Sequence, residues 1–546
     1  RAAVFTPHPL VDSENTRYLF GIVSALQMIW CEYIDVLVTA DNPCQTDSCF
    51  KTGPLAQKYL QHKGTYTPRV HVVSAPPGDP DLHPADDPGA LLNDKYDVFV
   101  LVASEKLPSH RGIGSGINFF VCDFPFDVDT MQSEDKIAYL SSYDGVITSS
   151  FYSHSWYTWY TRPYFLRARN RGFMLPDIHT VLPPVPWLKK PKDVPHFQAL
   201  NNTIYISFFG DFFPGENNNG HDVALTLLGR LQKDFPYAHL HLYMLGMVST
   251  MPESDDYVNA LKDRASSERL DVEFIVNPSL DQNSNTIGKS LLFWDMGGVH
   301  LAGRADPTVG ALFDSAVVQA MAVGCIVIAQ DHGVAPEIIR HNKHGFLASS
   351  INDYYKYSVK VLHSTLSDLS TMRAEAAKRA VVFDPFQHIT KLATQFKSSI
   401  VLEKLHKLVA PYTSTIRTVK VSAAEAGTTD RMAAIILTGF QTSTEFVVRQ
   451  TMRKLGDSWQ LGLWVTELNA DFYREIFADI PNIQYQMLPK HLHGDSFAES
   501  VLLKSMAFWD VISAKKVLVF DSNSLIVNPS IDAFMDYDFI GSPVAV

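Results

Sequence analysis

The stretch from Leu312 to Leu347, LFDSAVVQAMAVGCIVIAQDHGVAPEIIRHNKHGFL, constrains the fold of this chain more than any other. A helix rich in Val, Ala and Met leads to Gly324, and an uninterrupted apolar strand, Cys325–Ala329, follows. Apolar strands flanked by helices are typical of buried parallel strands in an α/β sheet. The loop after such a strand lies at the carboxyl edge of the sheet, where open sheets bind ligands. Gly333 in this loop lets a phosphate approach the backbone, and the helix that begins near Glu337 supplies free N–H groups.

Length and composition narrow the class of protein. A chain of 546 residues is too long for one core and suggests three domains. The net charge of −12 argues against a nucleic-acid binder, and no nucleic-acid partner is expected. No run of about 18 apolar residues occurs, so we expect no transmembrane segment and a soluble protein, with the cytoplasm slightly favoured as its compartment. Cys44 and Cys49 flank a polar loop and either form a disulfide or stay reduced.

The first part of the chain, residues 1–195, alternates short apolar strands with helices. Such alternation implies parallel βαβ units. The proline-rich passage LPPVPWLKKPKDVP, residues 182–195, then breaks the pattern and is typical of an interdomain linker. The predicted strands are Tyr33–Thr39, Tyr96–Ala103, Asn118–Cys122 and Gly145–Ser149.

A second α/β unit, residues 196–410, opens with the apolar strand Thr203–Phe209. The loop DFFPGENNNG then leads into a helix whose apolar residues follow the i, i+3, i+4, i+7 spacing of one buried face. An amphipathic helix around residues 388–409 closes the unit. Further strands are predicted at His239–Leu245 and Val272–Val276.

Residues 411–430 are small and polar, which favours a second linker. A third unit, residues 431–546, then begins with a strand and a helix that starts at a Thr-x-x-Glu capping box formed by Thr442 and Glu445. Phe497–Ile512 is predicted as another helix. The expected strands are Ala433–Leu437, Leu461–Val465, Ile483–Met487 and Lys516–Phe520.

The order of residues in the stretch described first resembles the donor-sugar half of glycosyltransferase family 4, whose usual wording is close to FGxxxxEAMAxGxPVVxxxxGGxxEIVxxxxxGxL. The resemblance implies the α/β GT-B architecture, in which two Rossmann-like domains face each other across a cleft and a terminal helix crosses back to the first domain. The ending FDSNSLIVNPSIDAFMDYDFIGSP resembles uncharacterised GT-A-like domains. Because that fold is about half complete at Val546, the third unit is expected to be a truncated GT-A-like domain.

Four positions that the family uses for its donor carry other side chains here. In the family loop G-R-F-x-x-x-K-G, Arg and Lys contact the phosphates, whereas Asp211 stands at the Arg position and Asn219 near the Lys position. An acid that faces a diphosphate repels it. The two glutamates that the family uses for ribose and sugar correspond to Gln319 and Ala311. Gln319 still offers an amide oxygen to a ribose hydroxyl, and Ala311 offers nothing.

Other donor-binding positions keep their residues. Gly210, Gly220 and Gly333 match the family's glycines, and the segment from His300 resembles its H-A-T-G wording. Alternatives stay open: Gly333 in a tight turn, and His300 as a structural histidine. Glu337 either contacts donor hydroxyls or caps its own helix.

Two further sites are expected from residues that follow strands. Asp123 is the catalytic candidate in the first domain, and a turn-forming Asp is the alternative. Asp521 and Asn523 offer a carboxylate and an amide oxygen to Mn²⁺ or Mg²⁺ in the third unit, where a plain Asp-Ser-Asn turn is the alternative. The aromatic run 155–160, SWYTWY, stacks on sugars or forms a helix packing face.

The sequence therefore predicts a glycosyltransferase. It would move a sugar from a nucleotide-sugar donor to a glycan or glycoconjugate acceptor, with retention of configuration implied by the family. The GT-B pair needs no metal cofactor where helix N-termini and cationic side chains neutralise the diphosphate. The alternative is a catalytically degenerate GT-B scaffold or glycan-binding module, which the four substitutions favour.

Overall fold

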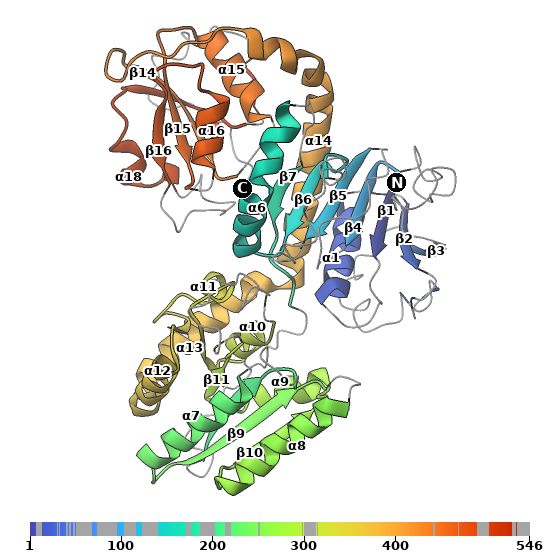
Figure 1. The fold of residues 1–546 in the computed structure, drawn as a ribbon, viewed down its shortest axis with the longest axis vertical. Coiled ribbons are helices and arrows are strands. Elements are labelled where there is room, and N and C mark those ends of the chain that lie inside the picture. Colours follow the sequence, from blue (N-terminus) through green and yellow to red (C-terminus); the bar gives the residue numbers. More distant parts are fainter. Residues whose placement is uncertain are drawn as a thin grey trace.

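A computed structural model of the chain shows three parallel sheets, each with its own helices (Figure 1). It describes residues 1–6, 14–29, 31, 33–39, 42, 45–46, 50, 68–73, 96–102, 116–122, 140–170, 176–185, 203–212, 220–248, 252–297, 299, 313, 315–439, 443–467, 469–488, 502–522, 524–526 and 531.

The first unit is a seven-stranded parallel sheet with the strand order β3-β2-β1-β4-β5-β6-β7. The order reverses between β1 and β4, as in doubly wound α/β sheets. Strands β1, β4, β5 and β6 are buried along their whole length, which explains their largely apolar sequences. The elements are β1 (Ala2–Thr6), α1 (Glu14–Met28), β2 (Ile34–Thr39), β3 (Arg69–Val73), β4 (Val98–Val102), β5 (Ile117–Cys122), β6 (Gly145–Thr148), α6 (Phe151–Asn170) and β7 (Asp177–Thr180).

The second unit repeats this plan in a six-stranded parallel sheet with the order β10-β9-β8-β11-β12-β13. Its elements are β8 (Thr203–Phe209), α7 (His221–Asp234), β9 (His239–Gly246), α8 (Pro252–Ser267), β10 (Val272–Val276), α9 (Leu280–Ile287), β11 (Leu292–Trp294), α10 (Ser315–Ala322), β12 (Ile326–Gln330), α11 (Ala335–Ile338), β13 (Gly345–Ala348), α12 (Ile351–His363), α13 (Leu366–Ala380) and the 3₁₀ helix η4 (Val381–Phe383). The predicted strands of both units are confirmed, with ends that shift by one or two residues.

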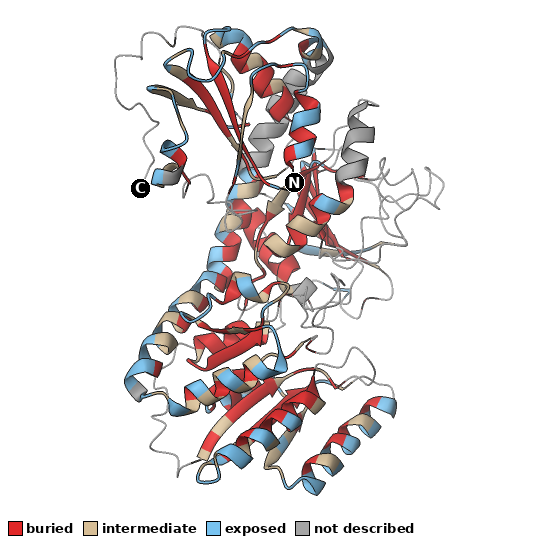
Figure 2. Ribbon diagram, turned by 60° about the vertical axis from the view of Figure 1, so that its left-hand side comes forward, coloured by how far each residue is buried: buried red, intermediate tan, exposed pale blue. Residues whose placement is uncertain are grey.

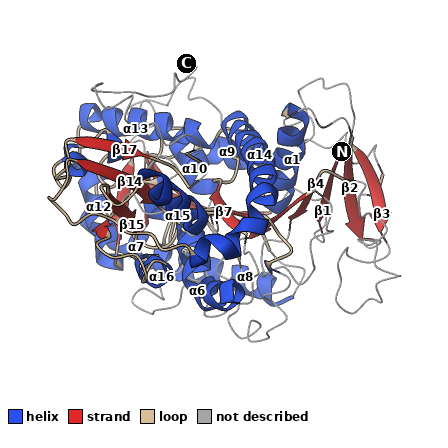
Figure 3. Cartoon of the chain, turned by 90° about the horizontal axis from the view of Figure 1, so that it is seen from above, coloured by secondary structure: helices blue, strands red, loops and turns tan. Residues whose placement is uncertain are grey.

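Helix α14 (Pro385–Thr418) returns the chain from the second unit to the first. Its side chains Leu392 and Phe396 lie in the same buried cluster as the apolar face of α1. The rings of Phe396 and Phe119 meet edge to face at 5.1 Å, and Figure 3 shows α14 alongside α1. Two doubly wound sheets joined by a helix that crosses back form the GT-B arrangement, so the α/β GT-B part of the predicted fold class is confirmed.

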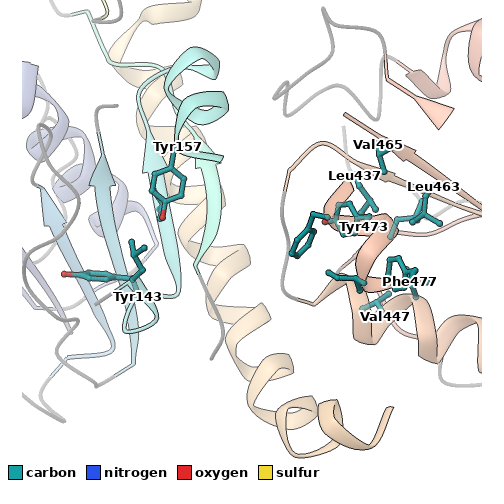
Figure 4. Close-up of a cluster of buried hydrophobic side chains, with 14 of the residues drawn as sticks. Tyr143, Tyr157, Leu437, Val447, Leu463, Val465, Tyr473 and Phe477 are labelled. Atoms are coloured by element: carbon teal, nitrogen blue, oxygen red, sulfur yellow. The ribbon is translucent and has the colours of Figure 1, made fainter. Parts of the chain in front are cut away.

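The third unit is a four-stranded parallel sheet with the order β16-β15-β14-β17. One hydrophobic cluster contains side chains of both the first and the third unit. Figure 4 shows Tyr143 and Tyr157 on the first-unit side of this cluster and Leu437 and Tyr473 on the other. The elements are β14 (Arg431–Leu437), α15 (Thr444–Leu455), β15 (Gln460–Val465), α16 (Ala470–Ile476), β16 (Gln484–Met487), α18 (Met506–Trp509) and β17 (Lys516–Val519).

Three local expectations differ from the structure. Helix α14 continues to Thr418, so the linker expected at 411–430 is helical in its first part. Helix α15 has Ser443 as its N-cap without a side-chain cap, and Glu445 instead binds Arg417 and Arg449. Thr442, the other residue of the predicted capping box, lies outside the described residues. The helix expected at 497–512 is interrupted at Ser505, which has an extended backbone before α18.

Buried residues concentrate in the strands, and the outward faces of the helices carry the exposed residues (Figure 2). Among the described helices, none combines the length and the apolar character needed to cross a membrane. The predicted compartment is a separate matter and stays a prediction.

Candidate active site

The first part of the candidate site is the turn that follows β8. The backbone N–H of Gly210 donates to Leu245 O at 2.9 Å. A Cβ at Gly246 would lie 2.0 Å from Gly210 O, so the carboxyl ends of β8 and β9 lie too close together for a side chain at position 246. Next to this contact, Asp211 Oδ1 accepts from the N–H of Met247 at 3.0 Å. Burial raises the pKa of Asp211 and this hydrogen bond opposes the rise, which gives the acid a structural role at the turn.

The start of α7 lies against the same turn. Gly220 has φ of 84°, and a Cβ there would come within 2.9 Å of Met296 Cβ, so both conformation and space favour glycine. The next residue, His221, is fully buried. Its Nε2 lies 3.0 Å from Gly210 O and so donates to it. Its ring stacks on Phe212 at 4.8 Å. Burial lowers the pKa of His221 to about 4, and the neutral ring therefore braces the turn.

Helix α10 carries Gln319, the residue at the family's ribose-binding position. Gln319 is only 7% exposed, and its neighbours along α10 are buried with it. At the start of α10, Ser315 Oγ accepts from Arg17 Nη1 at 3.3 Å. Arg17 comes from α1 of the first unit, 298 residues away in the chain. No local pattern in the sequence pointed to this cation, because only the packing of the two units brings it to α10.

The loop after β12 contains Gly333 and Glu337, two of the predicted donor-binding residues. Gly333 has φ of 63°, so a turn conformation that favours glycine is one reason for its presence. Glu337 contacts the first unit. Its Oε2 accepts from the N–H of Phe151 at 2.8 Å, and its Oε1 accepts from the N–H of Tyr152 at 2.6 Å. The carboxylate thus binds the start of α6 in place of its own helix, and the donor contact of Glu337 stays a prediction.

The surroundings of Glu337 shift its titration. Burial raises the pKa of the carboxyl group to about 7, against the lowering effects of the two N–H groups and of Arg379. Arg379 also holds the loop through its backbone, because Nη2 donates to Glu337 O at 2.6 Å and Nε donates to Ile338 O at 3.2 Å. The loop is therefore anchored to α13 on one side and to α6 on the other.

Aromatic rings of α6 continue from this contact. His332 meets Tyr152 at 5.7 Å, and Trp156 lies edge to face with both Tyr152 and Trp159. Trp159 is 54% exposed, whereas Tyr157 is fully buried. The run SWYTWY thus supplies a packing face through Tyr157, and it leaves one indole open to solvent.

Several predicted residues lie outside the described part of the chain, and the structure places none of them. They are Asp123, Asn219, His300, Ala311 and Asn523, together with Cys44 and Cys49.

Asp521 belongs to the third unit and lies apart from the residues above, just after β17. Ser522 Oγ donates to its Oδ1 at 3.1 Å, and Ser524 closes the turn through the N–H of Asp521. Within the described residues, no group of three or more His, Cys, Asp or Glu side chains is arranged to hold a metal ion. Asn523, the second predicted ligand, lies outside the described residues. The Mn²⁺ or Mg²⁺ site in the third unit therefore stays a prediction.

A known family is similar to most of the second unit. Residues 215–379 match the family model described as glycosyl transferases group 1. The predicted class of enzyme, a glycosyltransferase, is confirmed. The match covers the described parts of this unit from Gly220 to Arg379, with α10 and the loop of Glu337. Residues 482–546 match a family described as a protein of unknown function, DUF5672, so the GT-A-like character of the third unit stays a prediction.

Solved structures with a similar course of the chain include HepE from Anabaena in complex with UDP and glucose (15% identity, TM-score 0.48, 73% of this chain and 99% of that one). A glycosyltransferase from Rickettsia africae (12%, 0.47, 73% and 99%) and the sucrose-phosphate synthase of Thermosynechococcus elongatus (12%, 0.47, 73% and 98%) are also similar. Similarity at this level does not identify a substrate. Among curated proteins, none matches this chain.

Proposed function

We propose that this chain transfers a sugar from a nucleotide-sugar donor to a glycan or glycoconjugate acceptor, with retention of configuration as in family 4. The observation that carries the proposal is the group 1 glycosyltransferase match over residues 215–379. That segment contributes α10 and the loop after β12, and Glu337 of this loop is in contact with α6 of the first unit. A donor bound at this carboxyl edge would thus face the unit that we propose holds the acceptor.

The donor diphosphate needs positive charge, and Asp211 and Asn219 do not provide it. We propose that Arg17 does so from the first unit. Its guanidinium already reaches Ser315 at the start of α10, where the positive end of the helix dipole adds to the attraction for an anion. Gln319 on the same helix is the proposed partner of the ribose.

This arrangement needs no metal in the GT-B pair, because cations and helix N-termini neutralise a leaving diphosphate. In the third unit, a GT-A-like fold with Mn²⁺ or Mg²⁺ remains the prediction from sequence. Asp521 is the one carboxylate there that belongs to both the prediction and the described residues.

A degenerate scaffold or glycan-binding module is the second candidate. Two observations favour it: the carboxylate of Asp211 is engaged by Met247, and that of Glu337 by α6. In such a protein the former donor residues would serve only to hold the loops and units together.

A thermal-shift screen of the full chain against UDP-, GDP- and ADP-glucose, with and without Mn²⁺, separates the two candidates. A ligand at a hundredfold excess over its Kd stabilises the folded state by about 2.7 kcal/mol. A metal-independent rise in Tm with one nucleotide sugar is expected and would name the donor base. No rise with any of them would favour the scaffold.

Variants tie this binding to the proposed residues. Arg17→Ala and Gln319→Ala are each expected to weaken binding of the nucleotide sugar about tenfold, and Arg17→Ala should weaken binding of the free nucleoside diphosphate as well. Arg230→Ala is the matched control, because Arg230 binds Asn352 and stacks over Tyr355 within the second unit. Equal affinity in all three variants would exclude the assigned roles.

A further inference from the structure

The carboxylate of Glu337 lies at a junction that neither unit forms alone. The residue belongs to the short helix after β12 in the second unit. Both of its carboxylate oxygens accept hydrogen bonds from the first unit, from the N–H groups of Phe151 and Tyr152. Such a two-pronged contact fixes direction as well as distance.

The N–H groups that donate to Glu337 belong to the N-terminus of α6, a helix of 20 residues. The first N–H groups of a helix have no partner within the helix, and a carboxylate placed there also complements the helix dipole. Ser150 Oγ accepts from the N–H of Ser153 at 2.9 Å, so the helix's own cap serves the third residue. Glu337 serves the first and second residues. The cap of α6 is therefore completed by a side chain of the other unit.

The loop that contains Glu337 is also fixed by helix α13. Arg379 of α13 donates to the backbone carbonyls of Glu337 and Ile338, so the backbone that carries the carboxylate is held in position. A displacement of the loop after β12 would therefore also displace the start of α6. The same helix begins just after β6, at the carboxyl edge of the first sheet.

We propose that Glu337 is a positioning residue that fixes the loop after β12 to α6 and thereby sets how the donor-side and acceptor-side units face each other during transfer. The role in transfer rests on the proposed function, whereas the coupling of the two units rests on the hydrogen bonds of Glu337. Glu337 acts through α6 and does not touch the donor. Removal of its carboxylate should thus change turnover and leave donor affinity nearly unchanged.

Hydrogen exchange of the full chain tests the contact without any substrate. The N–H groups of Phe151 and Tyr152 are expected to be protected in the wild type, because Glu337 is their partner. In Glu337→Ala, exchange at these two positions should be at least tenfold faster, while the amides of β12 keep their rates. Glu337→Gln, whose amide oxygen accepts only one of the two bonds, should give an intermediate rate.

Glu375→Gln is the matched control for these variants. Glu375 lies on the same unit and pairs with Lys343 there, so its neutralisation should leave the first turn of α6 unchanged. If α6 exchanges at the wild-type rate in Glu337→Ala, the inference is wrong.

Calorimetry with UDP-glucose and the rate of UDP release at saturating UDP-glucose provide the functional readout. In Glu337→Ala, we expect Kd and KM within twofold of the wild type and kcat at least tenfold lower, with partial recovery in Glu337→Gln. A tenfold loss of affinity with an unchanged kcat would assign Glu337 to the donor and overturn the inference.

The two proposals fail in different ways. If the wild-type chain shows no heat with any of the three nucleotide sugars, the proposed function fails, and hydrogen exchange alone decides whether Glu337 couples the units. If the wild type binds and turns over UDP-glucose and Glu337→Ala does so equally well, the inference fails and the proposed function stands.

Discussion

At the scale of single residues, burial controls the charge of several histidines. His154, His221 and His388 are almost completely buried, and burial lowers the pKa of each to about 4. They are therefore neutral in the folded chain near pH 7. His388 donates from Nδ1 to Leu182 O at 2.9 Å, which requires no charge. Neutral, hydrogen-bonded histidines suit the places where loops and units meet.

These lowered pKa values predict acid sensitivity. An unfolded histidine has a pKa of about 6.5, so each buried histidine stabilises the fold fully above that value and loses its contribution as pH falls toward 4. Between pH 6.5 and pH 5, each should lose about 1.6 kcal/mol. The raised pKa of Glu337 acts in the opposite sense, since it favours the fold at lower pH, but three histidines outweigh one carboxyl group.

The measurement is the Tm of the full chain from pH 7.5 to pH 5, with the variant His154→Leu beside the wild type. The wild type should lose stability steadily below pH 6.5, and the variant should lose less. A flat profile over this range would contradict the assignment of the histidines as neutral and buried.

At the scale of elements, α14 joins the first two units through a close contact with α1. Gly21 of α1 faces His388 of α14, and a Cβ at position 21 would lie 2.5 Å from His388 Nε2. The ring of Tyr18 meets the same histidine edge to face at 5.1 Å. A residue without a side chain thus lets the two helices approach around one imidazole.

The variant Gly21→Ala is therefore expected to destabilise the chain by about 1–3 kcal/mol, the usual cost of overpacking a dense contact. In the background of His388→Ala, which removes the clashing ring, the same change should cost little. Thermal unfolding of the two single variants and the double variant measures this coupling. Strict additivity would show that the two side chains do not meet.

At the scale of the whole molecule, α6 links all three units. Its start is held by Glu337 of the second unit, and its residue His154 approaches the loop after β14 of the third unit. A Cβ at Gly439 would lie 3.4 Å from His154 Nε2. Asn469 and Tyr473 fix that loop by donating to Gly439 O, each at 3.0 Å. Motion of one unit would thus be transmitted to the others through this helix.

Gly439→Leu should act as a wedge between the third unit and α6. We expect the thermal unfolding of the variant to separate into two transitions, one of them at a lower temperature than any in the wild type. Strand β16 lies in the same sheet but is separated from β14 by β15, so exchange of its amides should not change. An unfolding curve equal to that of the wild type would mean that this contact does not couple the units.

The sequence by itself determined the parallel strands, because a strand buried on both faces is apolar along nearly its whole length. Val98–Val102 is apolar throughout, and β12 is apolar up to its last residue, Gln330. It also determined the glycines at turns with positive φ, Gly220 and Gly333, since that conformation is a local property.

Only the tertiary structure decided the partners of charged side chains. Glu337 binds the N-terminus of α6, Glu445 pairs with Arg417 and Arg449, and Arg17 of α1 binds Ser315 at the start of α10. The physical reason is that a strand or turn is selected by its own residues and their neighbours in the chain. A buried charge takes whichever donor or acceptor the packing of distant elements brings within about 3 Å.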